Sequence, residues 1–118
     1  MLKSIIEHNK SFAEKGKGAH YATSKYPDRH LAIVTCMDTR LIEMLPAALG
    51  IKNGDAKIIK DAGGMIVHPF GSVVRSLLIA IYELGVTDIM VVGHTDCGVQ
   101  HMDVDEITNK MIEEVRNQ

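Results

Sequence analysis

The stretch LAIVTCMDTR, residues 31–40, decides the predicted fold, because an apolar run passes directly into a set of reactive side chains. Its first half is apolar or β-branched, as in a strand covered on both faces. A second stretch, IMVVGHTDC at residues 89–97, repeats this order. Neighbouring strands of a parallel sheet end at the same edge. The sequence therefore predicts that Cys36, His94 and Cys97 meet there, although 58 positions separate Cys36 from His94.

Strand-like and helix-like stretches alternate along the chain, which is typical of an α/β protein with a parallel sheet. We expect one domain over residues 1–118 with an N-terminal helical arm at about residues 1–29. The predicted fold is a three-layer Rossmann-like fold, in which helices flank a small parallel sheet of strand order 2-1-3. Strands are expected at Leu31–Thr35, Ala56–Lys60 and Val86–Gly93, and helices at Leu2–Ala13, Leu41–Leu49, Ser72–Leu84 and Val104–Arg116. In the last helix, Val104, Ile107, Met111 and Val115 are expected to face inward.

Two thiolates and an imidazole suit Zn²⁺, and three protein ligands with a free fourth position are typical of a catalytic zinc site. Cys36 and Cys97 are the only cysteines of the chain. A disulfide between them is one alternative, although an intracellular protein rarely keeps one. Two unrelated buried cysteines are another, because a free cysteine packs as a small core residue. Iron or cobalt could also occupy the same ligands.

Three motifs in this order resemble the β-class carbonic anhydrases, and the similarity runs from about His30 to about Gly98. They are Cys-x-Asp-x-Arg at residues 36–40, Asp-Ala-Gly-Gly at residues 61–64 and Gly-His-Thr-x-Cys-Gly at residues 93–98. The resemblance implies a carbonate dehydratase, a lyase in which zinc-bound hydroxide attacks carbon dioxide and yields bicarbonate and a proton.

The resemblance also assigns roles to individual residues. Cys36, His94 and Cys97 are expected to bind one zinc ion per chain, and Asp38 and Arg40 to form the catalytic pair beside it. If Arg40 releases Asp38, the freed carboxylate could instead become the fourth ligand and close the site, as in one subtype of the family.

Other residues are expected around this centre. The substrate pocket is predicted to include Met37, Ala62, Gly63 and Val67, of which Met37, Ala62 and Val67 are apolar and suit a small nonpolar gas. Asp61 stands where the family usually has Asn. Asp96, between His94 and Cys97, is expected to support these ligands or to form a turn, with capping of the following turn as the alternative, and His101 is a candidate proton shuttle.

Two other functions stay open. Members of the same scaffold hydrolyse carbonyl sulfide or carbon disulfide, and the choice depends on access to the pocket. A zinc-binding regulatory protein without turnover is the alternative from a different class. Asp61 and the ending at Gln118 keep it open, since the family usually continues with a further strand and helices.

The composition limits the partners. A net charge of −2 and a pI near 6.3 argue against nucleic acid or an anionic membrane as partner. The apolar runs are too short to span a bilayer, and with no apolar leader we expect a soluble, cytoplasmic protein.

A sheet this small has exposed edges and a thin core, which favours a homodimer or higher homo-oligomer. The family resemblance adds that the N-terminal helix reaches over the partner.

Overall fold

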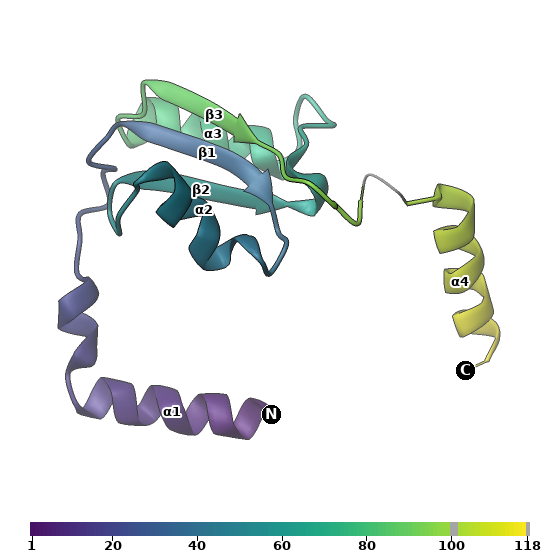
Figure 1. Cartoon of the computed structure of the whole chain (residues 1–118), viewed down its shortest axis with the longest axis horizontal. Coiled ribbons are helices and arrows are strands. Elements are labelled where there is room, and N and C mark those ends of the chain that lie inside the picture. The colour runs from purple at the N-terminus through teal and green to yellow at the C-terminus, as the bar shows by residue number, and fades with distance from the viewer. Residues whose placement is uncertain (100–101, 118) are drawn as a thin grey trace.

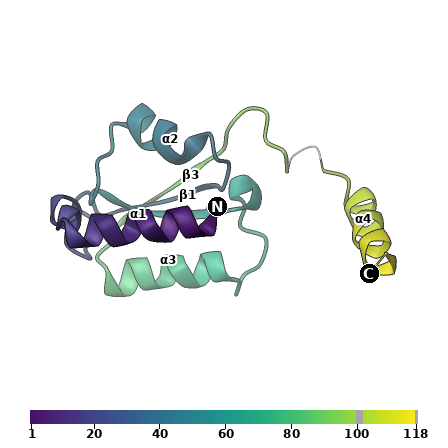
Figure 2. The ribbon, with the colours of Figure 1, turned by 90° about the horizontal axis from the view of Figure 1, so that it is seen from below.

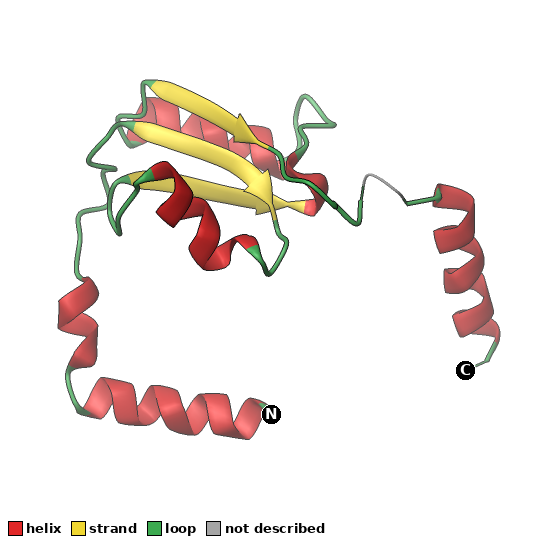
Figure 3. Cartoon of the chain, in the orientation of Figure 1, coloured by secondary structure: helices red, strands yellow, loops and turns green. Residues whose placement is uncertain are grey.

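The computed structural model describes residues 1–99 and 102–117, and a three-stranded parallel sheet lies at its centre (Figure 1). The strands are β1 (Leu31–Cys36), β2 (Ala56–Asp61) and β3 (Asp88–Val92). The α-helices of the described residues are α1 (Leu2–Glu14), α2 (Leu41–Leu49), α3 (Ser72–Glu83) and α4 (Val104–Arg116), and two 3-10 helices are η1 (Lys17–Tyr21) and η2 (Ala62–Gly64). The strand order is β2-β1-β3, which confirms the predicted α/β topology (Figure 3).

The central strand β1 is buried on both faces because its apolar side chains alternate between two helices. Val34 belongs to a buried cluster that includes Leu77 of α3. Ile33 belongs to a second cluster that includes Leu45 of α2. Figure 2 shows α2 and α3 on opposite sides of the sheet. This double coverage explains why the run at residues 31–36 has no polar side.

The parallel register brings the three motifs to one edge of the sheet. Cys36 at the end of β1 is paired with Asp61 at the end of β2, and Thr35 is paired with Val92 at the end of β3. The hydroxyl of Thr35 donates a hydrogen bond of 2.9 Å to the Val92 carbonyl. This bond fixes β3 against β1 immediately before the chain turns into the His94 loop.

Most bounds lie within one residue of the prediction, and the largest difference is at the start of the third strand. The third strand begins at Asp88 rather than Val86, because the N–H of Val86 donates to the carbonyl of Ala80 in α3 at 3.0 Å, and the ladder with β1 starts at the pair Leu31–Asp88. Val86 is therefore bonded to the end of α3 instead of to β1. Within the predicted N-terminal helical arm, the short helix η1 follows α1.

The terminal helices α1 and α4 stand away from the sheet in Figure 1, and neither contains a buried residue. The prediction that the apolar face of α4 points inward is wrong for the single chain, since Val104, Met111 and Val115 are all exposed. The radius of gyration is 18.0 Å, against roughly 13.5 Å for a compact domain of this length. No helix of the described residues is long and apolar enough to cross a membrane.

Candidate metal centre

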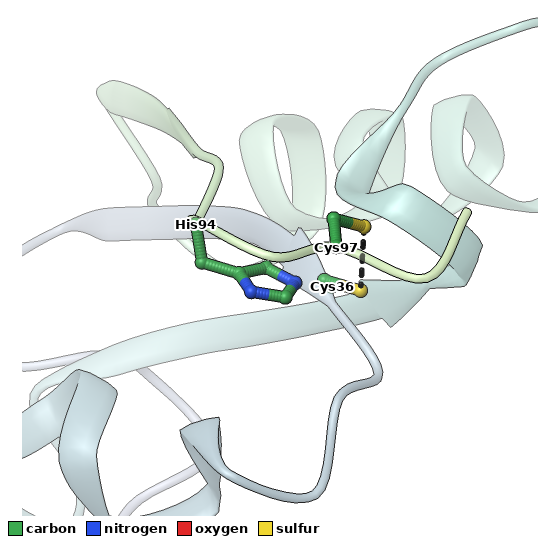
Figure 4. A group of neighbouring side chains, drawn as sticks. All are labelled: Cys36, His94 and Cys97. Carbon is green, nitrogen blue, oxygen red and sulfur yellow. Dashed lines mark hydrogen bonds between the residues drawn. The ribbon is translucent and has the colours of Figure 1, made fainter. Parts of the chain in front are cut away.

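The carboxyl edge of the sheet brings Cys36, His94 and Cys97 together, as Figure 4 shows. One potential ligand atom from each residue lies within 4.8 Å of the other two. Both cysteines are buried and free, with their sulfur atoms 3.9 Å apart. The structure therefore holds two thiols, and the disulfide alternative is absent from it.

Local chain geometry explains how these residues meet. Cys36 is the last residue of β1, whereas His94 and Cys97 lie in the loop after β3. The helix η2 presses against the end of β1 at Gly64, whose φ is 64°. A Cβ atom at Gly64 would lie 3.0 to 3.1 Å from backbone atoms of Thr35 and Cys36. Glycine is therefore required there, both for the left-handed backbone and for the close approach.

The imidazole of His94 is oriented by its own loop. Its Nδ1 lies 2.9 Å from the carbonyl oxygen of Thr95. A carbonyl only accepts hydrogen bonds, so Nδ1 carries a proton, and in the neutral imidazole Nε2 is then the nitrogen that presents a lone pair. Nε2 is buried and has no hydrogen-bond partner. A buried, unpartnered nitrogen beside two buried thiols is an arrangement that a zinc ion satisfies, so the residues present fit this metal.

The electrostatics of the site favour ligand ionisation. The neighbouring imidazole of His94 is the largest influence that lowers the pKa of the Cys36 thiol, to about 7, while burial opposes this change. Backbone N–H groups of Asp38 and Gly63 lower the same pKa further. In return, Cys36 raises the pKa of His94. Because the thiolate is the form that binds metals, Cys36 is prepared for binding near neutral pH.

Asp38 and Arg40 form a fork beside this group. Arg40 donates from Nε to Asp38 Oδ1 at 2.9 Å and from Nη2 to Oδ2 at 2.6 Å, and its backbone N–H donates to Oδ1 at 2.8 Å. These bonds hold the pKa of Asp38 well below its usual range. Oδ2 also lies 3.9 Å from Nε2 of His94. An ionised carboxylate therefore stands next to the nitrogen that points into the metal-binding group.

Arg40 has a second acidic partner that the sequence did not reveal. Its Nη1 lies 3.2 Å from Oδ2 of Asp96, and its Nη2 donates to the backbone carbonyl of Asp96 at 2.8 Å. Asp96 was expected to support the neighbouring ligands, to form a turn or to cap one, and no contact with Arg40 was predicted. Its contact with Arg40 spans 56 positions, so only the folded chain reveals it.

A hollow of about 400 Å³ opens beside the metal-binding group. Met37 lines it, as the sequence predicts for the substrate pocket, together with Asp38 and Arg40. Val99 and Met102 add apolar surface that sequence reasoning missed, because neither belongs to a recognisable motif. The hollow thus combines an ionised pair with an apolar wall.

The remaining predicted pocket residues do not line this hollow. Ala62 and Gly63 form η2, and Gly63 packs against Val99, whose Cγ1 would be 3.2 Å from an added Cβ. Val67 lines a separate hollow of about 140 Å³. The side chain of Asp61 lines this second hollow too, while its carbonyl accepts the N–H of Met37 at 2.8 Å. The substrate-pocket roles of Ala62, Gly63 and Val67 stay predictions.

His101, the candidate proton shuttle, lies outside the described residues. The geometry that is described nevertheless defines a class of protein. It is an α/β protein that presents a Cys-His-Cys group, with an adjacent Asp-Arg pair, at the carboxyl edge of a parallel sheet.

Comparisons with known proteins identify the family. The sequence pattern described as carbonic anhydrase matches residues 31–117. The crystal structure of β-carbonic anhydrase isoform I from Trichomonas vaginalis is 41% identical, with a TM-score of 0.85 over 97% of this chain and 63% of that one. The chain belongs to the β-carbonic anhydrase family.

Two further relatives define what is shared. The Bacillus subtilis protein YvdA, whose name places it among the carbonic anhydrases, is 53% identical over 92% of this chain and 55% of its own length. A carbon disulfide hydrolase from Saccharolobus solfataricus is 36% identical over 73% of this chain and 40% of its own length. The chain therefore spans about half the length of these relatives, so their activities are not transferred with the family.

Proposed function

We propose that this protein is a zinc-dependent carbonate dehydratase that hydrates carbon dioxide reversibly to bicarbonate and a proton. The observation that carries the proposal is the buried, unpartnered Nε2 of His94, which lies beside two buried thiols and 3.9 Å from the carboxylate of Asp38. A structural role would need neither an unsatisfied nitrogen nor an ionised carboxylate at that place.

Cys36, His94 and Cys97 would hold one zinc ion per chain and leave its fourth position free. When bound, zinc lowers the pKa of a water molecule enough to make it a nucleophile near neutral pH. The contact of Nδ1 with the Thr95 carbonyl, which makes Nε2 the ligand atom of the neutral imidazole, and the lowered pKa of the Cys36 thiol prepare two of the three ligands for this metal.

The chain's own residues then position the reactants. Asp38 is held ionised by Arg40, so it acts as a hydrogen-bond acceptor that orients the attacking water toward the substrate. Arg40 restrains the carboxylate in one orientation through its fork. Met37, Val99 and Met102 offer an apolar surface in the same hollow, which suits a small nonpolar gas.

Hydrolysis of carbon disulfide or carbonyl sulfide is the second candidate. It is favoured by the similarity to the carbon disulfide hydrolase of S. solfataricus and by the apolar wall of the hollow. Both substrates are linear and nonpolar like carbon dioxide, and the same residues would act on them.

We also propose that the chain works as a homodimer or higher homo-oligomer. The apolar residues Leu2, Ile5 and Ile6 of α1 are exposed, and the chain is more extended than a compact domain. A second copy is the partner proposed to cover this face. The expected cytoplasmic location stays a prediction.

Stopped-flow measurement of carbon dioxide hydration, on protein of known zinc content, tests the proposed function. A rate that depends on zinc, and that falls about 100-fold in Asp38→Ala with zinc retained, is expected from the loss of a positioned acceptor. Asp28→Ala, an exposed carboxylate near the opposite edge of the sheet, is the matched control. Full zinc occupancy without turnover would reject carbon dioxide hydration. The same assay with carbonyl sulfide and carbon disulfide would then separate the second candidate from a non-catalytic zinc-binding protein.

A further inference from the structure

We propose that Asp96 is a positioning residue, whose left-handed backbone turns its carbonyl onto Arg40 and so couples the second metal-ligand loop to the Asp38–Arg40 pair. The role for catalysis rests on the proposed function. The coupling itself is a property of the fold, and it is testable without turnover.

The backbone of Asp96 has an uncommon conformation. Its φ is 54°, and among the described residues only His30 shares a positive φ without being glycine. This left-handed region is costly for most L-residues, and Asp and Asn are among the few that visit it routinely. A strained backbone of this kind is kept only where the surrounding contacts fix it, and such residues are often found at functional sites.

The consequence of this conformation is a bond to Arg40. The carbonyl of Asp96 accepts a hydrogen bond from Nη2 at 2.8 Å. The same Nη2, together with Nε, also donates to the carboxylate of Asp38. Arg40 therefore lies between the two segments that carry the metal-binding residues. Its planar set of donors allows both partners to be held at once.

The backbone carbonyl, rather than the carboxylate, carries this link. The Asp96 side chain is 84% exposed and its Oδ2 is 3.2 Å from Nη1, so solvent screens that ion pair and it contributes little. The carbonyl bond is shorter and charge-assisted. It also originates from a loop that is fixed on both sides, by His94 and by the buried Cys97. Moving that loop would withdraw the acceptor and loosen the hold of Arg40 on Asp38.

Substitutions at position 96 separate the two contributions. Asp96→Asn and Asp96→Gly remove the charge but tolerate the left-handed backbone. Asp96→Val removes the charge and opposes that backbone, because a β-branched residue rarely adopts positive φ. Asp96→Ala also removes the charge and opposes the left-handed backbone, but less strongly because alanine is not β-branched.

The readout is hydrogen exchange of the Arg40 Nε–H, followed by NMR on the full chain as purified and with its zinc content determined. The chain has only four arginines, and Arg40→Lys assigns the signal. This proton is one of the two that the guanidinium of Arg40 donates to Asp38, so its protection reports the fork directly.

We expect Asp96→Asn and Asp96→Gly to keep the protection of the Arg40 Nε–H within about threefold of the native value. Asp96→Val should lower this protection about tenfold or more, and Asp96→Ala should lie between these results. Cooperative urea unfolding checks that each variant is folded, and Ala replaces Val in the comparison if Val is not. Unchanged protection in a folded Val or Ala variant would overturn the proposal. A loss of protection in Asp96→Asn and Asp96→Gly as large as in Asp96→Val would also overturn the proposal, because the carboxylate of Asp96 would then carry the contact with Arg40.

The hydration rate gives a second readout. Asp96→Val should lose more kcat than Asp96→Asn, with the zinc content retained in both variants. A chain that lacks turnover altogether would reject the proposed function but leave the exchange experiment valid, so the two failures are distinguishable.

Discussion

Ile33 in β1 is fully buried, whereas Ile5 in α1 and Met111 in α4 are 57% and 62% exposed. All three occupy apolar stripes of regular elements, and the patterns of their elements are similarly clear. The difference lies in what covers them. β1 has α2 on one face and α3 on the other, but the apolar faces of α1 and α4 meet no comparable surface among the described residues.

This contrast shows that the candidate metal centre depends on the sheet and not on the terminal helices. The three possible ligands, the Asp38–Arg40 fork and Asp96 all lie at ends of β1 and β3 or in the loops that follow them. The terminal helices add exposed apolar surface, which is suited to association. Perturbing the sheet should therefore affect metal binding and stability, and perturbing α1 should affect assembly.

The largest expected effect is on zinc binding. His94→Gln removes the only nitrogen of the metal-binding group and should weaken zinc affinity by more than about 100-fold, which exceeds the usual loss for a supporting residue. His8→Gln on the exposed face of α1 is the matched control and should leave affinity unchanged. Competition with a chelator measures both. Equal affinity in the two variants would remove His94 from the site.

The second effect is on stability. Ile33→Ala should destabilise the chain by about 2 to 5 kcal/mol, because the buried cluster cannot refill the space. Met111→Ala should change the free energy of unfolding by less than about 0.5 kcal/mol, since its side chain is exposed. Urea unfolding of both variants is the measurement. A comparable loss in Met111→Ala would show that α4 is packed in solution and would break the contrast.

The third effect is on assembly. Ile5→Lys should weaken self-association about 10- to 100-fold, because a buried isoleucine contributes about 1.5 to 3 kcal/mol. Lys10→Ala, on the polar side of the same helix, should not. Sedimentation velocity across a concentration series distinguishes them. If Ile5→Lys associates as tightly as the native chain, α1 is not the interface.

The fourth effect, the smallest of the four when taken per pH unit, is a pH dependence confined to the sheet edge. The pKa of Cys36 is lowered to about 7, so below that pH zinc must displace a proton from the thiol, and above it the thiolate is already formed. The raised pKa of His94 has the same effect, because a proton on the imidazole competes with zinc as the pH falls. Zinc affinity should therefore fall by at least about tenfold per pH unit as the pH drops below 7. A flat profile between pH 7 and 5 would contradict this assignment.

The sequence predicted much of the fold because its patterns are local. The run at residues 31–36 has no polar side, which placed β1 in the centre, and the alternation of elements then predicted the order β2-β1-β3. The convergence of Cys36, His94 and Cys97 followed from the same argument, since parallel strands end at one edge. The predicted start of the third strand was wrong because the N–H of Val86 bonds to the carbonyl of Ala80 in α3 and not to β1.

What the sequence determined by itself is the strand order and the residues that reach the carboxyl edge of the sheet, because hydrophobic periodicity and motif position are properties of neighbouring residues. Only the tertiary structure decided that Asp96 meets Arg40, that Val67 and the Asp61 side chain line another hollow, and that α4 is exposed. Those outcomes depend on side-chain direction and on contacts across many positions, which no local pattern specifies.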